Sequence, residues 1–280
     1  EKNKKQFMRR GRFYLYKYFF LFKTLNATNL NIFQTIAKCF MILKLVLTVT
    51  GDVFDSRFAN TLHWLENENL VNTLVKNGFS KPSLVITGNP MYDASYKKIQ
   101  QLQSSKKGDK IRVLLLPSTH YEHGFWTKEK RDFVISEIIK KLLENKNQFE
   151  LTIKIHPSTA ILSEYESIIS PIDKSIKIYQ NDEVLDFLND ADVVISFWFG
   201  SAEVYALLTK KPLIFCNFFN NHTDLILQRG LALECKEVSS LIASIHKVIL
   251  SNPASDQKRD EFIQEILYKW DGKASERLSD

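Results

Sequence analysis

The chain has 280 residues and a net charge of +6, and 44% of its residues are hydrophobic. This length allows one large domain or two modest ones, since single cores stop growing at roughly 250–300 residues. The cysteines Cys39, Cys216 and Cys235 lie far apart without a Cys-x-x-Cys spacing. They therefore suggest neither a disulfide framework nor a zinc site, and they favour a reducing, cytoplasmic compartment.

The N-terminal region has the least regular pattern. Basic and aromatic residues alternate over residues 9–23, which read RRGRFYLYKYFFLFK. One interpretation is a segment that contacts a membrane surface, and the other is a solvated helix with edge elements of a domain. A nucleic-acid contact would rest on the arginines alone, so we expect no nucleic-acid partner.

The apolar stretch Ile32–Val49 predicts a helix rather than a membrane span. It is interrupted by Gln34, Lys38 and Lys44, and a charged residue costs about 2.5–3.5 kcal/mol at a bilayer centre. The chain begins with Glu and lacks the features of a signal peptide, which indicates a fragment or a processed chain.

Residues 50–110 predict the end of one domain and a linker. Apolar residues recur at helical spacing from Asp55 to Asn77, and Gly78 supplies a stop, so we predict a helix there. Residues 83–90, SLVITGNP, predict a short strand that ends in a turn. Gln100–Lys110 is polar without a hydrophobic period, which is typical of a linker. The predicted organisation is a partial, acceptor-side N-terminal domain over 1–99, a linker over 100–110 and a second domain over 111–280.

Beyond the linker, strand and helix patterns alternate. Strands are predicted at Arg112–Leu116, Phe149–Ile155, Ile176–Tyr179, Val193–Ser196 and Pro212–Cys216. Helices are predicted at Lys128–Glu144, Ala160–Ile169, Glu183–Asn189, Ala202–Thr209, Thr223–Arg229 and Val238–Leu250. This alternation predicts right-handed βαβ units, and hence an α/β domain with a Rossmann-like parallel sheet covered by helices on both faces.

Three polar loops follow the predicted strands, at the sheet edge where α/β folds bind ligands. Neither the dinucleotide fingerprint Gly-x-Gly-x-x-Gly nor a Walker phosphate loop is present, so other loops must provide a nucleotide site. Gly200, Ser201 and Glu203 open a helix, where backbone amides could bind a diphosphate and Glu203 could accept hydrogen bonds from ribose hydroxyls. The local alternative is that Ser201 caps the helix and Glu203 complements its dipole, each contributing about 0.5–2 kcal/mol.

His156 and Pro157 follow a second strand. An imidazole at this edge could donate to a phosphate oxygen or act as an acid or base, although a single histidine in a loop often has no such role.

Residues 117–124, PSTHYEHG, follow a third strand. The hydroxyls of Ser118 and Thr119, the imidazoles of His120 and His123, and the carboxylate of Glu122 could line the same cleft. The two histidines with Glu122 would also suit a metal, but no further ligand has a convincing spacing, so we expect none.

In this order the motifs resemble the GT-B-fold sugar-nucleotide superfamily, which holds the non-hydrolysing UDP-N-acetylglucosamine 2-epimerases and the CDP-glycerol glycerophosphotransferases. The matching segments run from about residue 52 to the end, and they are VITGNPMYDA (85–94), PSTHYEHG, IKIHP, DEVLDFLNDADVVIS, GSAEVYALLTKKPLIF and WDGKASERL (270–278). The resemblance implies a GT-B-like fold with a truncated N-terminal domain and a last helix that folds back across both domains. It also implies that His156 faces the phosphates of a nucleotide, that Gly200 and Ser201 contact them, and that Glu203 binds ribose.

Departures from the superfamily narrow the expected activity. Residues 196–200 read SFWFG where the epimerases carry Asp-Ser-Gly-Gly and paired carboxylates, and the loop at 120–123 reads HYEH where they carry His-Arg and Glu-Asn. The Asp-Tyr-Ser-Ser pattern of the glycerophosphotransferases is also absent. We therefore expect a glycosyltransferase or glycerophosphotransferase-like enzyme of surface-polymer biosynthesis, with His156, His120 and His123 as catalytic candidates.

Such an enzyme would take a UDP- or CDP-linked donor as substrate and a glycan or lipid-linked acceptor, with no further cofactor. Two alternatives remain. One is an enzyme like the sugar-nucleotide 2-epimerases, and the other is a non-catalytic nucleotide-binding or scaffold module.

Overall fold

The computed structural model describes residues 31–48, 62–102, 108–117, 119–219 and 224–279. The chain divides into two compact units, residues 1–61 with 78–80, and residues 62–77 with 81–280. The first unit contains helix α2 (Ile32–Thr48), which confirms the predicted helix. The basic aromatic segment at residues 9–23 lies outside the described residues. Among the described helices, none is both long enough and apolar enough to cross a membrane.

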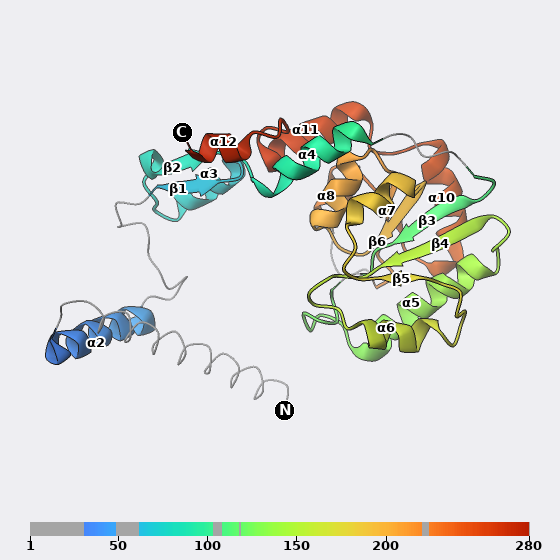
Figure 1. Ribbon diagram of the computed structural model, residues 1–280, viewed down its shortest axis with the longest axis horizontal. Coiled ribbons are helices and arrows are strands. Elements are labelled where there is room, and N and C mark those ends of the chain that lie inside the picture. Colours follow the sequence, from blue (N-terminus) through green and yellow to red (C-terminus); the bar gives the residue numbers. More distant parts are fainter. Residues whose placement is uncertain (1–30, 49–61, 103–107, 118, 220–223, 280) are drawn as a thin grey trace. The chain divides into compact units, whose positions relative to one another are not determined.

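A six-stranded parallel sheet forms the centre of the second unit (Figure 1). Its strands are β3 (Ile111–Leu115), β4 (Phe149–Lys154), β5 (Ile178–Tyr179), β6 (Val193–Ser196), β7 (Leu213–Cys216) and β8 (Leu233–Cys235). They lie in the order β5-β4-β3-β6-β7-β8, which is the 3-2-1-4-5-6 order of a Rossmann fold. The sequence pattern predicted all of these strands except β8, which is only three residues long and carries Glu234 at its centre.

Successive residues of each central strand enter two different cores. In β3, Val113 and Leu115 pack into one core and Leu114 into the other, and β6 alternates in the same way. The first core is closed by α5 (Lys128–Leu143), α6 (Leu162–Ile169) and α10 (Leu241–Leu250). The second is closed by α7 (Val184–Asp190), α8 (Ser201–Leu208), α9 (Leu225–Gln228) and α11 (Asp256–Leu267). Both faces of the sheet are therefore buried, as the continuous apolar runs predicted.

The predicted helix over Asp55–Asn77 is confirmed over Glu68–Lys76, where helix α3 lies, and is wrong at residues 63–65. Residues His63–Leu65 form strand β1, which pairs in parallel with β2 (Leu84–Ile86), a strand that the sequence did predict. Helix α3 begins only at Glu68, because the side chain of Asn67 accepts a hydrogen bond from the amide of Leu70 at 3.0 Å. The pairing of β1 with β2, about twenty residues later, has no signature in the local periodicity.

Helix α4 (Met91–Gln101) includes the first two residues of the predicted linker. The remaining limits of the proposed domains, and the linker beyond this helix, stay predictions. The other predicted helices agree with the structure to within one or two residues, except that α10 is preceded by a short turn of 3₁₀ helix over Val238–Ser240.

The last helix, α12 (Ala274–Ser279), is fastened to α4 and β2 by polar contacts. The carboxylate of Asp93 on α4 accepts hydrogen bonds from the amides of Ala274 at 3.0 Å and Ser275 at 2.7 Å. The Nε of Arg277 donates to the carbonyl oxygen of Thr87 at 2.7 Å, directly after β2. Thus two sequence motifs that lie almost 200 residues apart form one contact, which is called the tail clamp below.

Aromatic rings and a glycine complete the tail clamp. Trp270 lies edge-on to Tyr96, with ring centroids 5.1 Å apart. Gly272 has a φ of +69°, and a Cβ added there would lie 2.7 Å from the ring of Tyr96. Glycine is therefore needed at residue 272 for its conformation and for its lack of a side chain.

We expect Gly272→Ala to reduce the free energy of unfolding by about 2 kcal/mol or more. The positive φ costs on the order of 1 kcal/mol, and the contact with Tyr96 adds strain in a packed region. Urea unfolding of the purified chain measures the loss. Gly124→Ala is the matched control, because Gly124 has a φ of +79° but open space around its Cβ position. Equal losses in the two variants would show that Tyr96 imposes no constraint.

Candidate functional site

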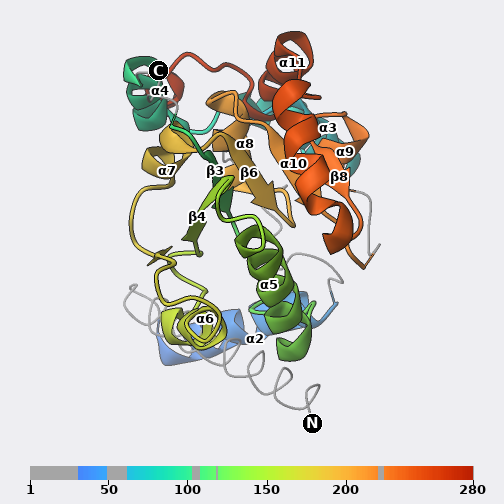
Figure 2. The same cartoon turned by 90° about the vertical axis from the view of Figure 1, so that its right-hand side faces the viewer.

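The strand order reverses between β3 and β6, and the connections after these two strands lead to opposite faces of the sheet (Figure 2). At such a switch point the loops diverge and leave a crevice outside the carboxyl ends of the strands. The loop at residues 116–127 follows β3, and residues 197–200 follow β6. His156 and Pro157 follow β4, the next strand on the other side of β3. The predicted site residues therefore gather at one edge of the sheet.

The Nδ1 atom of His156 is engaged by its own loop. It accepts hydrogen bonds from the amides of Ser158 and Thr159, each at 3.2 Å. In the neutral ring this assigns the remaining proton to Nε2. Partial desolvation, aided by the nearby charges of Lys154 and His123, lowers the pKa of His156 against the opposing effect of Glu122. At neutral pH the side chain is thus an uncharged hydrogen-bond donor.

Lys154, directly before this loop, is buried, although none of the carboxylates that the structure describes is in hydrogen-bond contact with it. Its Nζ donates to the carbonyl oxygens of Ile155 at 2.9 Å and Gln180 at 2.8 Å. Burial lowers its pKa. Sequence reasoning missed this residue because a lysine in an apolar strand pattern gives no sign of where its amine ends. Its charge contributes a positive potential at the end of β4.

The loop after β3 separates the two catalytic candidates that it carries. His123 is exposed, whereas His120 is buried and stacks on Trp126 with centroids 4.7 Å apart. The acid or base role of His120 stays a prediction, and its position among aromatic rings gives it a packing role that the sequence did not suggest. Thr119 is half-buried in the same loop, and Ser118 lies outside the described residues.

The carboxylate of this loop, Glu122, was expected from the sequence to line the cleft. The hydroxyl of Tyr165 on α6 donates to Oε1 of Glu122 at 3.0 Å, while Oε2 is buried without a hydrogen-bond partner among the described residues. The charge of Glu122 acts on His156 and opposes the lowering of its pKa. Glu122 is therefore an additional candidate for proton transfer at this edge.

The N-terminus of α8 differs from the expectation that Ser201 caps it, while Glu203 lies in the first helical turn as expected. Gly200, not Ser201, is the N-cap residue, and Ser201 is the exposed first residue of the helix. Glu203 turns inward, where its Oε2 accepts a hydrogen bond from the amide of Gly200 at 2.8 Å. The amide of Gly200 is thus already engaged, and ribose binding by Glu203 stays a prediction. Ser201 and Ala202 supply the amides with which a helix can meet a phosphate.

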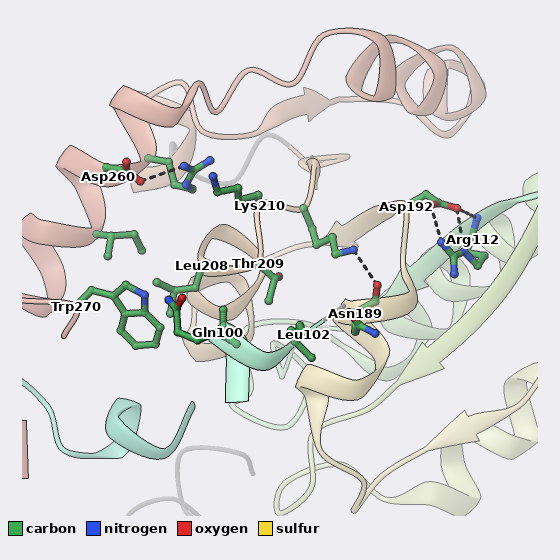
Figure 3. A pocket seen from close by; sticks show the side chains of 14 residues that line it. Gln100, Leu102, Arg112, Asn189, Asp192, Leu208, Thr209, Lys210, Asp260 and Trp270 are labelled. Atoms are coloured by element: carbon green, nitrogen blue, oxygen red, sulfur yellow. Dashed lines mark hydrogen bonds and ion pairs between the residues drawn. The ribbon is translucent and has the colours of Figure 1, made fainter. Parts of the chain in front are cut away.

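A cavity of about 610 Å³ lies at the other ends of the strands (Figure 3). It is lined by Arg112 and Asp192 at the start of β3 and β6, by Lys211, and by Trp270. Arg112 pairs with Asp192 at 2.9 Å, and the Nζ of Lys211 donates to the carbonyl oxygens of Asn189 and Ala191. None of the predicted site residues lines this cavity.

The comparisons with known proteins reach solved structures only. No protein-family model matches the chain, and no curated protein matches it. A UDP-GlcNAc 2-epimerase from Methanocaldococcus jannaschii is 18% identical over 74% of this chain and 61% of its own, with a TM-score of 0.48. The wall teichoic acid polymerase TagF is 12% identical over 90% of this chain and 62% of its own, with a TM-score of 0.48. A pneumococcal O-GlcNAc transferase is 17% identical over 82% of this chain and 48% of its own, with a TM-score of 0.47.

The first of these proteins is an epimerase, the second a polymerase and the third a transferase. The chain spans less than two thirds of the length of each. At identities below 20%, the likeness establishes no shared activity.

We expect Glu203→Gln to remove a component of the pH dependence of stability. Burial raises the pKa of Glu203 to about 7, whereas an unfolded glutamate titrates near 4.3. The folded state thus holds a proton that the unfolded state has released, so this contribution is complete below about pH 4 and is lost as the pH rises to about 7. Relative to the variant, the wild type should lose on the order of 2–3 kcal/mol between pH 5 and pH 8.

Chemical denaturation across this pH range checks the expectation. Glu166→Gln, at an exposed position on α6, is the control and should change the profile little. Parallel wild-type and Glu203→Gln profiles would mean that Glu203 is ionised throughout.

Proposed function

We propose that residues 111–280 bind the diphosphate of a UDP- or CDP-linked donor at the carboxyl ends of β3, β4 and β6. The reversal of strand order between β3 and β6 carries this proposal, because it brings His156 and the first turn of α8 to the same edge. Of the activities compatible with such a site, we infer a glycosyltransferase or glycerophosphotransferase-like reaction in surface-polymer biosynthesis. The motif resemblance supports this choice.

The proposed chemistry follows from the hydrogen-bond donors at the carboxyl-end edge of the sheet. In the transfer, an acceptor hydroxyl oxygen forms a bond to the transferred group while the bond to the leaving phosphate oxygen breaks. The negative charge that develops on that oxygen is stabilised by the Nε2–H of His156, by the amides that open α8, and by the potential of Lys154. The hydroxyl proton passes to a base, for which His123 and Glu122 are candidates. The acceptor is a glycan or a lipid-linked acceptor.

A non-catalytic nucleotide-binding module is the second candidate. The burial of His120 favours it, because it withdraws one of the expected acid or base groups from the solvent. Both candidates require nucleotide binding at this edge, and only the first requires transfer.

Nucleotide binding can be tested by a thermal-shift screen with UDP, CDP, GDP, ADP and their sugar or glycerol conjugates. A ligand at 100 times its dissociation constant stabilises the folded state by about 2.7 kcal/mol. We expect a selective shift with one uridine or cytidine series. Release of nucleotide from its conjugate in the presence of glycan acceptors then separates the enzyme from the binding module. No shift with any nucleotide would contradict both candidates.

We expect His156→Asn to weaken nucleotide diphosphate binding by roughly tenfold while leaving stability nearly unchanged. An asparagine oxygen can still accept the amides of Ser158 and Thr159, but the variant lacks the Nε2–H that would meet the phosphate. His156→Ala loses both functions and should in addition lower the free energy of unfolding by about 1 kcal/mol. Isothermal titration calorimetry and urea unfolding measure the two effects. Unchanged affinity in both variants would remove His156 from the site.

A further inference from the structure

Two exposed aromatic side chains lie together at the switch point. Phe125 is 68% exposed and Trp198 is 44% exposed. Their rings stack with centroids 6.0 Å apart and an angle of 11° between the planes. We call this pair of rings the aromatic platform. Phe125 belongs to the loop after β3 and Trp198 to the loop after β6, so the platform joins the loops that follow the two strands at the switch point. Contiguous apolar surface at such a position marks a site of contact with a ligand.

The platform is supported from within the protein by His120. This residue is 5% exposed and lies edge-on to Trp198, with centroids 4.8 Å apart and planes at 81°. On its other face it stacks on the buried ring of Trp126. Its carbonyl oxygen accepts the amides of Phe125 at 2.7 Å and Trp126 at 3.1 Å. His120 therefore acts as a positioning residue for both rings of the platform.

The loop of Trp198 is also fixed on its helical side. The amide of Phe199 donates to Asp224 at 3.2 Å, and that of Gly200 donates to Glu203 at 2.8 Å. The backbone next to Trp198 is thus held by two buried carboxylates. A surface ordered in advance loses little conformational entropy when a ligand binds to it.

The run Phe197-Trp198-Phe199 limits what can approach this loop. Small residues let a backbone come close to a phosphate, and only Gly200 offers that here. Trp198 stands three residues before Ser201, the first residue of α8. Trp198 and the helix N-terminus at which a phosphate could bind therefore belong to one short segment of the chain.

We propose that Phe125 and Trp198 form the surface on which the sugar ring of the donor stacks, so that the donor carries a hexose rather than glycerol or another open-chain polyol. The inference rests on the proposed function, since it takes the diphosphate to lie at the start of α8. The C–H face of a pyranose is apolar and flat enough to pack on an aromatic ring, whereas an open-chain polyol has no such face. Glu122 and His123, in the loop that carries Phe125, supply polar groups for the hydroxyls.

The test compares affinities for UDP, UDP-glucose, UDP-N-acetylglucosamine, CDP and CDP-glycerol by calorimetry, with intrinsic tryptophan fluorescence as a second readout. We expect a nucleotide-hexose to bind roughly fivefold more tightly than its nucleotide. Trp198→Ala and Phe125→Ala should abolish this gain and leave the affinity for the nucleotide unchanged. Trp198→Phe should retain most of the gain, because it keeps an aromatic face. The sugar conjugate, but not the nucleotide, should alter the tryptophan emission.

Two variants control for the loss of an exposed aromatic side chain elsewhere. Trp64 in β1 is 55% exposed and Phe133 on α5 is 56% exposed. Trp64→Ala and Phe133→Ala should keep the wild-type ratio of affinities.

Three results would overturn the inference alone. Equal affinities of wild type for a nucleotide and its hexose conjugates would show that the ring makes no contact. A loss of nucleotide affinity in Trp198→Ala as large as the loss for the conjugate would place the base on the platform. If Trp198→Ala weakened the binding of a nucleotide-free oligosaccharide but not that of the nucleotide-hexose, the platform would bind the acceptor instead. If no nucleotide binds the wild type, the proposed function itself is wrong and the inference fails with it.

Discussion

The burial of a fully parallel sheet on both faces is the constraint on which the second unit depends. Parallel strands need crossover connections, and the helices of these connections cover both faces of the sheet. Consecutive residues of β3 and β6 therefore enter two different cores, and the residues that do so, such as Val113–Leu115 and Val193–Ile195, are apolar. Polar groups with a chemical role are left to the strand ends, where the chain leaves the sheet.

The order of the strands then decides which loops meet. Because β3 has β4 on one side and β6 on the other, the loop after β3 lies between the loops that follow β4 and β6. His156, the loop with His120 and His123, and the start of α8 are brought to one edge although they are separated by 30 to 80 residues along the chain. Within this edge, hydrogen bonds to the backbone fix most side chains. His156 and Glu203 are each held by backbone amides, and this leaves one defined group of His156 to act on a ligand.

A second set of long-range contacts attaches the β1–β2 pair to the sheet domain. A two-stranded sheet is marginal by itself, and here it is held through the tail clamp of Asp93, Trp270 and Arg277. A further hydrogen bond joins the side chain of Asn67 to the carbonyl oxygen of Ile266 on α11 at 2.9 Å. The motifs at residues 85–94 and 270–278 therefore contact each other in the folded unit.

The sequence by itself determined the fold class and the edge of the sheet at which we propose the site. Continuous apolar runs predict the strands, and the helical patterns between them predict the helices. A strand that is buried on both faces needs apolar residues at successive positions, which can be seen in the sequence. Polar residues after each run mark the strand ends. The pattern could not recognise β1, because its residues fall within an apolar spacing typical of a helix, or β8, because Glu234 interrupts its three residues.

Only the tertiary structure decided the strand order, the inward turn of Glu203, the burial of His120, the hydrogen bonds that set the tautomer of His156, and the pairing of Phe125 with Trp198. Each of these depends on the partner that a side chain or strand meets after folding. That partner is chosen by packing and hydrogen bonding in three dimensions, for which neither residue type nor spacing along the chain carries a local signal.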